Sequence, residues 1–214
     1  MKNWIKYLLI ALVCLMVGGV ITGVIVKNNM KEKPLPKQEK SEGLRGVYDI
    51  DKNINEKTID NYLGRKDTVY RDVRMLEDTA TWENKGGTRN LTGFVEGFEV
   101  VPYPYLTKVS GLPEQVGESY TGKTLFTQNE DGKYEVNYKE SMDILEYLFP
   151  KDKYIFLMCG GGGYAGMTKN MLVSLGWNAD KIYNVGGFWY YEGKHKIEIK
   201  NEKYDDTSYD FWKI

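Results

Sequence analysis

The stretch "YIFLMCGGGGYAGM", from Tyr154 to Met167, carries the strongest indication of the fold. A continuous apolar run ends on one cysteine, Cys159, and four consecutive glycines follow it. The run is typical of a strand that is buried on both faces of a parallel sheet. Glycine loses much conformational freedom on folding, so four in a row indicate a backbone that must approach something closely. Helical spacing from Ala165, with Gly176 at its end, predicts a helix directly after this loop.

Strand and helix patterns alternate on both sides of this stretch. Strands are expected at 47–51, 68–73, 97–103, 154–158 and 181–185, and helices at 54–63, 141–149 and 165–176. Such alternation predicts an α/β fold with a mostly parallel sheet flanked by helices. Residues 123–138 alternate in polarity around Asp131-Gly132, which predicts a β-hairpin within an insertion over 105–138.

Length, charge and composition limit the function classes. The 214 residues fit one domain with an appendage, or two small domains. The net charge of −1 lacks the basic excess of a nucleic-acid-binding protein. We expect the soluble domain over 46–200 and a C-terminal tail over 201–214. No spacing of His, Cys and carboxylates suggests a metal site, and no cofactor is expected.

The N-terminal segment predicts a membrane anchor over 1–26. Residues 7–26, "YLLIALVCLMVGGVITGVIV", carry no charge, and 20 helical residues match a bilayer core of roughly 30 Å. Lys2 and Lys6 precede the run and favour a single-pass protein of the cell membrane with its domain on the extracytoplasmic side. Residues 27–45 contain prolines and alternating charges, which predicts a flexible linker.

Two other interpretations of the N-terminal segment stay open. A cleaved signal peptide has a shorter apolar region and small residues at its cleavage site, and no such pattern follows here. A lipoprotein signal would place Gly or Ala before Cys14, where Val13 stands. Gly19 and Gly23 form a G-x-x-x-G pair that would allow a weak homodimer, although glycines are also simply tolerated in membrane helices.

Three glycine patterns in the sequence are candidate binding loops. Residues 117–124, "GESYTGKT", fit the phosphate-loop pattern but lack the buried strand before it and the helix after it. Gly161, Gly163 and Gly166 fit the dinucleotide fingerprint, but no acidic residue ends a second strand about 20 residues later. The third pattern is the glycine loop that follows Cys159. The N–H groups of its loop converge at the positive end of a helix, which would stabilise a thiolate and lower the cysteine pKa.

An unreactive, buried thiol is the alternative to a reactive one. If residues 7–26 lie in the bilayer, Cys14 lies there too, and Cys159 has no intramolecular partner. An unpaired cysteine in an oxidising compartment is either buried or retained for its reactivity. The sequence therefore leaves both roles open for Cys159.

The loop and three further motifs resemble the rhodanese-like domain family over roughly residues 46–194. The loop motif consists of Cys159, Gly162, Ala165, Leu172, Gly176 and Trp177. The other motifs are "VYRDVR" (Val69–Arg74), "GFVEGFEVVPY" (Gly93–Tyr103) and "VGGFWYYEG" (Val185–Gly193). The resemblance implies a central, mostly parallel five-stranded sheet with helices on its flanks and the hairpin as an insertion.

The resemblance also implies sulfur transfer through a persulfide on Cys159. The partner would be a small sulfur-containing anion or a thiol acceptor. The substrate-binding loop would consist of Gly160, Gly161, Gly162, Gly163, Tyr164 and Ala165, supported by Asp72, Arg74 and Trp189. Many members of this family serve instead as binding or regulatory modules without measurable catalysis.

The loop departs from the family pattern in its charge. Active loops often carry Arg or Lys at positions where this chain has Gly160 and Tyr164. Lys85 and Arg89, in the segment after the second strand, are candidate sources of the missing charge. Two hypotheses follow: a sulfurtransferase, or a catalytically weak or inactive rhodanese-like binding module. A phosphatase or arsenate reductase would need a loop arginine to hold the oxyanion.

Overall fold

The computed structural model describes residues 32–74, 93–108 and 122–198. The chain divides into two units, Met1–Leu35 and Pro36–Ile214, and the fold described below belongs to the second. The predicted anchor over 1–26 and the predicted tail over 201–214 lie outside the described residues, as do Lys85, Arg89 and most of the 117–124 pattern. Within the described ranges, no helix is long and apolar enough to cross a bilayer.

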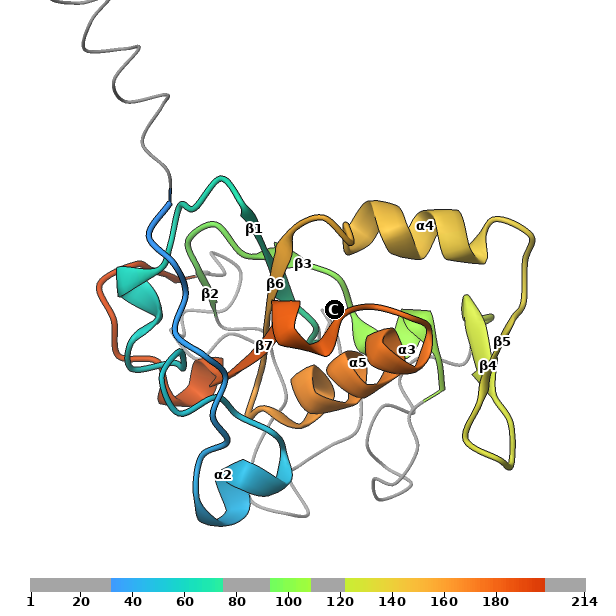
Figure 1. The fold of residues 1–214 in the computed structure, drawn as a ribbon, viewed down its shortest axis with the longest axis horizontal. Helices are drawn as coiled ribbons and strands as arrows, with labels where there is room; N and C mark the ends of the chain where they lie inside the picture. The colour runs from blue at the N-terminus through green and yellow to red at the C-terminus, as the bar shows by residue number, and fades with distance from the viewer. Residues whose placement is uncertain (1–31, 75–92, 109–121, 199–214) are drawn as a thin grey trace, which may run out of the picture. The chain divides into compact units, whose positions relative to one another are not determined.

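Four parallel strands form the central sheet, in the order β3-β1-β6-β7 (Figure 1). Their bounds are β1 Thr68–Asp72, β3 Glu99–Val100, β6 Tyr154–Cys159 and β7 Ile182–Gly187. Two antiparallel pairs accompany this sheet: β2 Gly93–Val95 with β8 Lys196–Glu198, and the hairpin of β4 Phe126–Gln128 with β5 Tyr134–Val136. The predicted α/β class, the parallel sheet and the hairpin are confirmed.

Helices cover one face of the sheet and enclose the main hydrophobic core (Figure 1). They are α3 Tyr103–Leu106, α4 Ser141–Leu148 and α5 Gly163–Ser174. The remaining helical segments are α2 Gly43–Val47 and three short 3-10 turns, η1 Ile59–Asn61, η3 Ala179–Lys181 and η4 Phe188–Tyr190. The predicted helices at 141–149 and 165–176 correspond to α4 and α5, and Gly176 ends α5 with φ 99°.

Strand β6 is buried on both faces, as its apolar run predicts. Ile155, Leu157 and Cys159 face the core under the helices, because alternate residues of a strand point the same way. Phe156, on the other face, lies edge-on to Tyr70 and Tyr183, with ring centroids 5.5 and 5.3 Å apart. Full burial of a large apolar side chain stabilises a fold by about 1.5–3 kcal/mol. The side chains of β6 therefore stabilise the packing on both faces of the sheet.

The prediction of a strand at 47–51 is wrong. Among the described residues the central sheet therefore has four strands and not the predicted five. Asp49 adopts φ 58°, a left-handed conformation that interrupts an extended chain. The Asp51 carboxylate then accepts hydrogen bonds from the N–H groups of Asn53 at 2.8 Å and Ile54 at 2.6 Å, which closes a turn. Only one parallel bridge, between Ile50 and Asn184, remains at the position of the fifth strand.

The expected helix at 54–63 is reduced to the single turn η1. Polar side chains compete there with the helical backbone. The Asn55 amide donates to the carbonyls of Asp51 and Lys52, and the Thr58 hydroxyl donates to that of Asn53 at 2.8 Å. Of the apolar residues of the pattern, Ile54 and Ile59 are nevertheless fully buried, whereas Tyr62 and Leu63 are half-buried.

The folded unit begins before Gly46, so residues 36–45 are not a free linker. The Gln38 side chain donates to the carbonyl of Ala179 at 2.8 Å, and the Tyr183 hydroxyl donates to that of Pro36 at 2.8 Å. Lys40 also forms an antiparallel bridge with Asp51. We call residues 36–51 the N-terminal strap.

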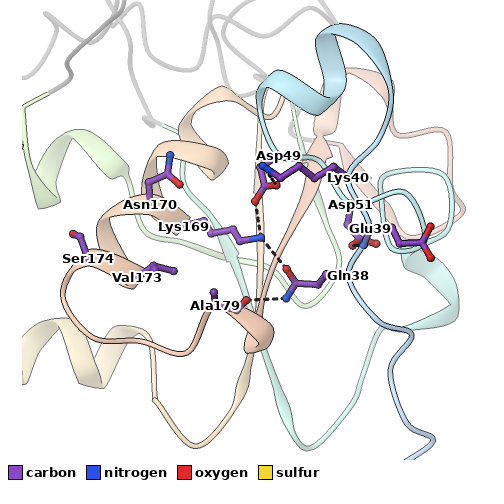
Figure 2. Close-up of a pocket in the computed structure, with 10 residues that line it drawn as sticks. All are labelled: Gln38, Glu39, Lys40, Asp49, Asp51, Lys169, Asn170, Val173, Ser174 and Ala179. Carbon is purple, nitrogen blue, oxygen red and sulfur yellow. Dashed lines mark hydrogen bonds and ion pairs between the residues drawn. The ribbon is translucent and has the colours of Figure 1, made fainter.

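Lys169 fastens the strap to α5 at the edge of a pocket of about 500 Å³ (Figure 2). Its ammonium lies 2.6 Å from the Asp49 carboxylate and donates to Gln38 at 2.8 Å. Lys40 approaches the same carboxylate at 3.1 Å. Burial alone would raise the pKa of Asp49, but the hydrogen bonds from Lys169 and Lys40 outweigh it and hold this pKa below its ordinary value of 3.8.

Replacing Lys169 with Met should destabilise the protein by about 1 kcal/mol at neutral pH, because the pair is partly buried and only partly screened. Since the pKa of Asp49 is lowered on folding, its contribution is present above about pH 4 and is lost as the pH falls below that value. Urea unfolding at pH 7 and pH 3 measures both effects. Lys52→Met is the matched control, because the pair of Lys52 with Glu39, at 3.6 Å, is exposed to solvent. If the two variants are equally stable at pH 7, the contacts of Lys169 with the strap do not stabilise the protein.

Candidate functional site

Cys159 is the last residue of β6, and the chain turns at once into α5. The turn requires Gly162, which caps the helix with φ 97°, a left-handed conformation that favours glycine. The carboxyl ends of β1, β6 and β7 meet at this edge of the sheet. The thiol therefore sits where a parallel α/β sheet commonly forms its binding site.

Backbone N–H groups surround the sulfur of Cys159. The N–H of Gly162 donates to Sγ at 3.0 Å, and those of Ala165 and Gly161 also favour the thiolate. The side chain is only 3% exposed and belongs to the hydrophobic core. The loop thus combines an anion-binding backbone with an apolar environment.

The prediction that the loop lowers the pKa of Cys159 is wrong. Burial disfavours the charged form and raises the pKa of Cys159 above its ordinary value, against the three N–H groups that lower it. The nearby carboxylate of Asp72 raises this pKa further. The resting residue is consequently a neutral thiol at pH 7.

Asn184 joins three segments beneath the loop. Its amide nitrogen donates to the carbonyls of Gly162 at 2.9 Å and Tyr48 at 2.6 Å, and its oxygen accepts from the N–H of Gly186 at 3.0 Å. The residue is fully buried in β7. Sequence reasoning missed this role, although a polar residue inside the apolar run "KIYNV" was the available signal.

The glycines of the site allow close contacts between backbone segments. A side chain at Gly187 would collide with the carbonyl of Gly160 and lie 2.6 Å from the Cα of Gly161. One at Gly166 would lie 2.6 Å from the carbonyl of Tyr48. Gly166 therefore belongs to the packing of α5 against the strap, whereas a side chain at Gly161 or Gly163 would meet ordinary contacts, with Trp189 at 3.5 Å and Tyr48 at 3.8 Å.

A partly buried ion pair lies beside Gly186. The Glu56 carboxylate is fully buried and lies 2.7 Å from the guanidinium of Arg45, which comes from α2. A side chain at Gly186 would strike this carboxylate. Sequence reasoning did not single out either residue, because their approach depends on the strap folding against β7.

Asp72 and Arg74 form a buried pair at the end of β1. Nε of Arg74 donates to both carboxylate oxygens of Asp72 at 2.9 Å, and its Nη2 donates to the same carboxylate and to the carbonyl of Gly93 at 2.7 Å. The guanidinium also lies over the ring of Phe188, 4.4 Å from its centroid. The pair thereby connects β1, β2 and η4.

Trp189 lies against the loop, whereas Tyr164 does not line its rim. The Trp189 indole packs over Gly160 and Gly161 while remaining 53% exposed, and its backbone N–H donates to the carbonyl of Gly160 at 3.2 Å. Tyr164 is buried in the core, with its ring 5.8 Å from that of Tyr103. The structure thus brings the loop, Asp72, Arg74 and Trp189 together at one end of the sheet.

The only histidine of the chain lies on the surface, where Nδ1 of His195 is 3.0 Å from the Glu96 carboxylate. In the described part of the chain, no group of three or more His, Cys, Asp and Glu side chains is arranged to hold a metal ion. No protein-family model, curated protein or solved structure matches the chain.

Replacing Gly187 with Ala should destabilise the protein by about 2–3 kcal/mol, because the new methyl group meets backbone atoms that cannot move aside. Gly163→Ala is the matched control, since its methyl group would find only Tyr48 at an ordinary 3.8 Å and should change stability by less than about 0.5 kcal/mol. Thermal unfolding of both variants tests this difference. Equal melting temperatures would contradict the close approach of β7 to the loop.

Alkylation of Cys159 by iodoacetamide should accelerate about tenfold per pH unit from pH 7 to 9 without reaching a plateau, because only the thiolate reacts and its pKa is raised. Mass spectrometry of the peptide that contains Cys159 separates its reaction from that of Cys14. The urea-unfolded chain is the control and should level off near the ordinary pKa of about 8.5. A plateau of the alkylation rate below pH 8 in the folded protein would show that the pKa of Cys159 is lowered and not raised.

Proposed function

We propose that the chain is a rhodanese-like sulfurtransferase that moves sulfane sulfur through a persulfide on Cys159. The observation that carries this proposal is the thiol at the end of β6 with the N–H groups of Gly161, Gly162 and Ala165 directed at it. Such a cradle stabilises negative charge on the sulfur and, after transfer, on a persulfide. The two motifs of the resemblance that contain β1 and β7 also lie beside this loop, which supports the same interpretation.

The reaction consists of two displacements at sulfur. The Cys159 thiolate attacks the outer sulfur of a donor such as thiosulfate, the S–S bond breaks, and sulfite leaves with the bonding electron pair. An acceptor thiolate then attacks the outer sulfur of the persulfide and releases the Cys159 thiolate. Because burial raises the pKa of this thiol, the reactive form is scarce at pH 7, and the rate should rise with pH.

A catalytically weak or inactive binding module is the second candidate. The burial of Cys159 and the raised pKa of its thiol favour it, together with the lack of Lys or Arg between Gly160 and Ala165. In that case the loop would bind an anion or a partner without accepting sulfur. Persulfide formation distinguishes the two candidates.

We further infer that residues 7–26 hold the protein in the cell membrane and leave the domain on the extracytoplasmic side. The uncharged run of 20 residues supports this placement, as do Lys2 and Lys6 before it. Gly19 and Gly23 would then allow a weak homodimer within the bilayer. A small sulfur anion or a thiol acceptor outside the cytoplasm would be the partner of Cys159.

Exposure of the full-length, detergent-solubilised protein to thiosulfate or polysulfide should add about 32 Da, the mass of one sulfur atom, to Cys159. Intact mass spectrometry with peptide mapping measures the adduct. Cys159→Ser should lose it, whereas the control Cys14→Ser should retain it. The binding-module interpretation replaces the catalytic one if the wild type gains no sulfur from either donor.

A further inference from the structure

We infer that the amino-terminal edge of the central sheet docks on anionic lipid headgroups, so that the Cys159 loop faces away from the membrane. The inference rests on the membrane placement proposed above and not on the chemistry of Cys159. It follows from where lysines gather in the fold and from where the chain enters it. We call this surface the basic edge, and its lysines are Lys66, Lys151, Lys153 and Lys181.

The strands β1, β6 and β7 begin side by side at the basic edge. They are parallel, and Thr68, the first residue of β1, lies beside Tyr154, the first residue of β6. Ile182, the first residue of β7, pairs with Ile155. Five basic and three acidic residues lie in the turns before these strands, at 64–67, 151–153 and 178–181. The edge is therefore more basic than the whole chain, whose net charge is −1.

Hydrogen bonds to backbone carbonyls hold the lysines of the basic edge together. Nζ of Lys153 donates to the carbonyl of Lys66 at 2.8 Å. Nζ of Lys181 donates to the carbonyls of Lys151 at 3.4 Å and Asp152 at 3.1 Å. All three bonds are exposed to solvent. Because carbonyl groups are uncharged acceptors, these bonds gather the ammonium groups without cancelling their charge.

The acidic groups near the basic edge offset only part of its charge. Asp67 is paired with Arg65 at 2.8 Å, and Glu146 lies 3.2 Å from one of the four lysines. Asp152 and Asp180 are exposed. Surface ion pairs of this kind contribute little stability, so the lysines are able to exchange them for lipid phosphates. A negatively charged lipid surface attracts such a cluster within a Debye length of about 10 Å at 0.1 M salt.

The chain enters the folded unit at the same edge. The hydroxyl of Tyr183, the second residue of β7, donates to the carbonyl of Pro36 at 2.8 Å. Gln38 donates to the carbonyl of Ala179, in the turn before β7. Residues 27–35 separate Pro36 from the proposed membrane span, and nine residues extend over at most about 30 Å. Docking is then intramolecular, so the high local concentration of lipid compensates for a modest number of lysines.

Docking through the basic edge determines where the site faces. Cys159 lies at the opposite end of β6 from this edge. A strand rises about 3.3 Å per residue, so the six residues of β6 place the loop about 20 Å from the basic edge. The Cys159 loop then faces the aqueous side of the headgroups, where a small sulfur anion or a thiol reaches it without crossing a negatively charged lipid surface.

Full-length protein in lipid nanodiscs tests the docking at two labelling positions on opposite ends of β7. Ala179→Cys lies in η3 before this strand, and Tyr190→Cys lies in η4 after it; both positions are exposed. Each is placed in a background of Cys14→Ser and Cys159→Ser. The rate of labelling by an uncharged maleimide-PEG, divided by that of N-ethylmaleimide, measures exclusion of the bulky reagent independently of the reactivity of the thiol.

The comparison of anionic with neutral lipid gives the main result. On discs with about 30% phosphatidylglycerol, the ratio at position 179 should be lower by about fivefold or more than on discs of phosphatidylcholine alone. At position 190 the ratio should change by less than about twofold, because the lipid does not cover that end of the strand. Since docking is electrostatic, about 0.5 M NaCl should remove the protection at position 179.

Charge variants identify the surface that makes the contact. Replacement of all four lysines of the basic edge with Gln should abolish the protection at position 179. The matched control removes the same charge from exposed lysines of the hairpin, the loop after it and the segment around β8, and should retain the protection. Its substitutions are Lys133→Gln, Lys139→Gln, Lys194→Gln and Lys196→Gln. The lipid and salt comparisons need no charge variant, so they decide the question even if one of these proteins fails to fold.

The outcomes distinguish the docking from the membrane placement beneath it. If the full-length chain stays in solution without lipid or detergent, the membrane placement fails and the docking fails with it. If the chain inserts but position 179 is labelled equally on both kinds of disc, or position 190 is protected as strongly, the docking is overturned while the anchor stands. Protection that survives the four changes at the basic edge also overturns it. Because the labelled proteins lack Cys159, no outcome depends on sulfur transfer.

Discussion

The side-chain amide of Asn184 is the interaction on which the site depends. It binds the helix cap through Gly162, the strap through Tyr48 and the following turn through Gly186. The bonds to Gly162 and Gly186 are buried, so loss of the amide would leave these polar groups without partners, at a cost of about 1–3 kcal/mol each. The position of the Cys159 loop is thus determined by a residue that has no chemical part in the reaction we propose.

The site places two opposing requirements on one sulfur atom. The N–H groups of the loop are arranged for an anion, whereas the surrounding core and the Asp72 carboxylate favour a neutral thiol. Because the apolar side chains under α5 also hold the loop in place, the same burial that organises the N–H groups suppresses the thiolate. Because the loop has no Lys or Arg, a donor that favours the thiolate of Cys159 must do so through other contacts.

The centre of the fold could be predicted from the sequence because its signals are local. A doubly buried strand, a glycine turn and a helix that ends at Gly176 each follow from short-range patterns, and β6 and α5 have the expected positions. The segments 47–51 and 54–63 could not be predicted in this way. There the side chains of Asp51, Asn55 and Thr58 bind nearby backbone and replace the regular structure that the apolar spacing favours. Asn184 and the strap were missed because their partners lie far away in the chain.

The strap also determines the order in which the site can form. Gln38 is separated from Ala179 by 141 residues and Tyr48 from Asn184 by 136, yet each pair is joined by a hydrogen bond. During synthesis the strap emerges long before its partners, and contacts of such high sequence separation form slowly. Ile50 and Tyr48 therefore reach the glycine loop only when β7 is in place. Until β7 has been synthesised, Asn184 cannot hold the strap against the loop of Cys159.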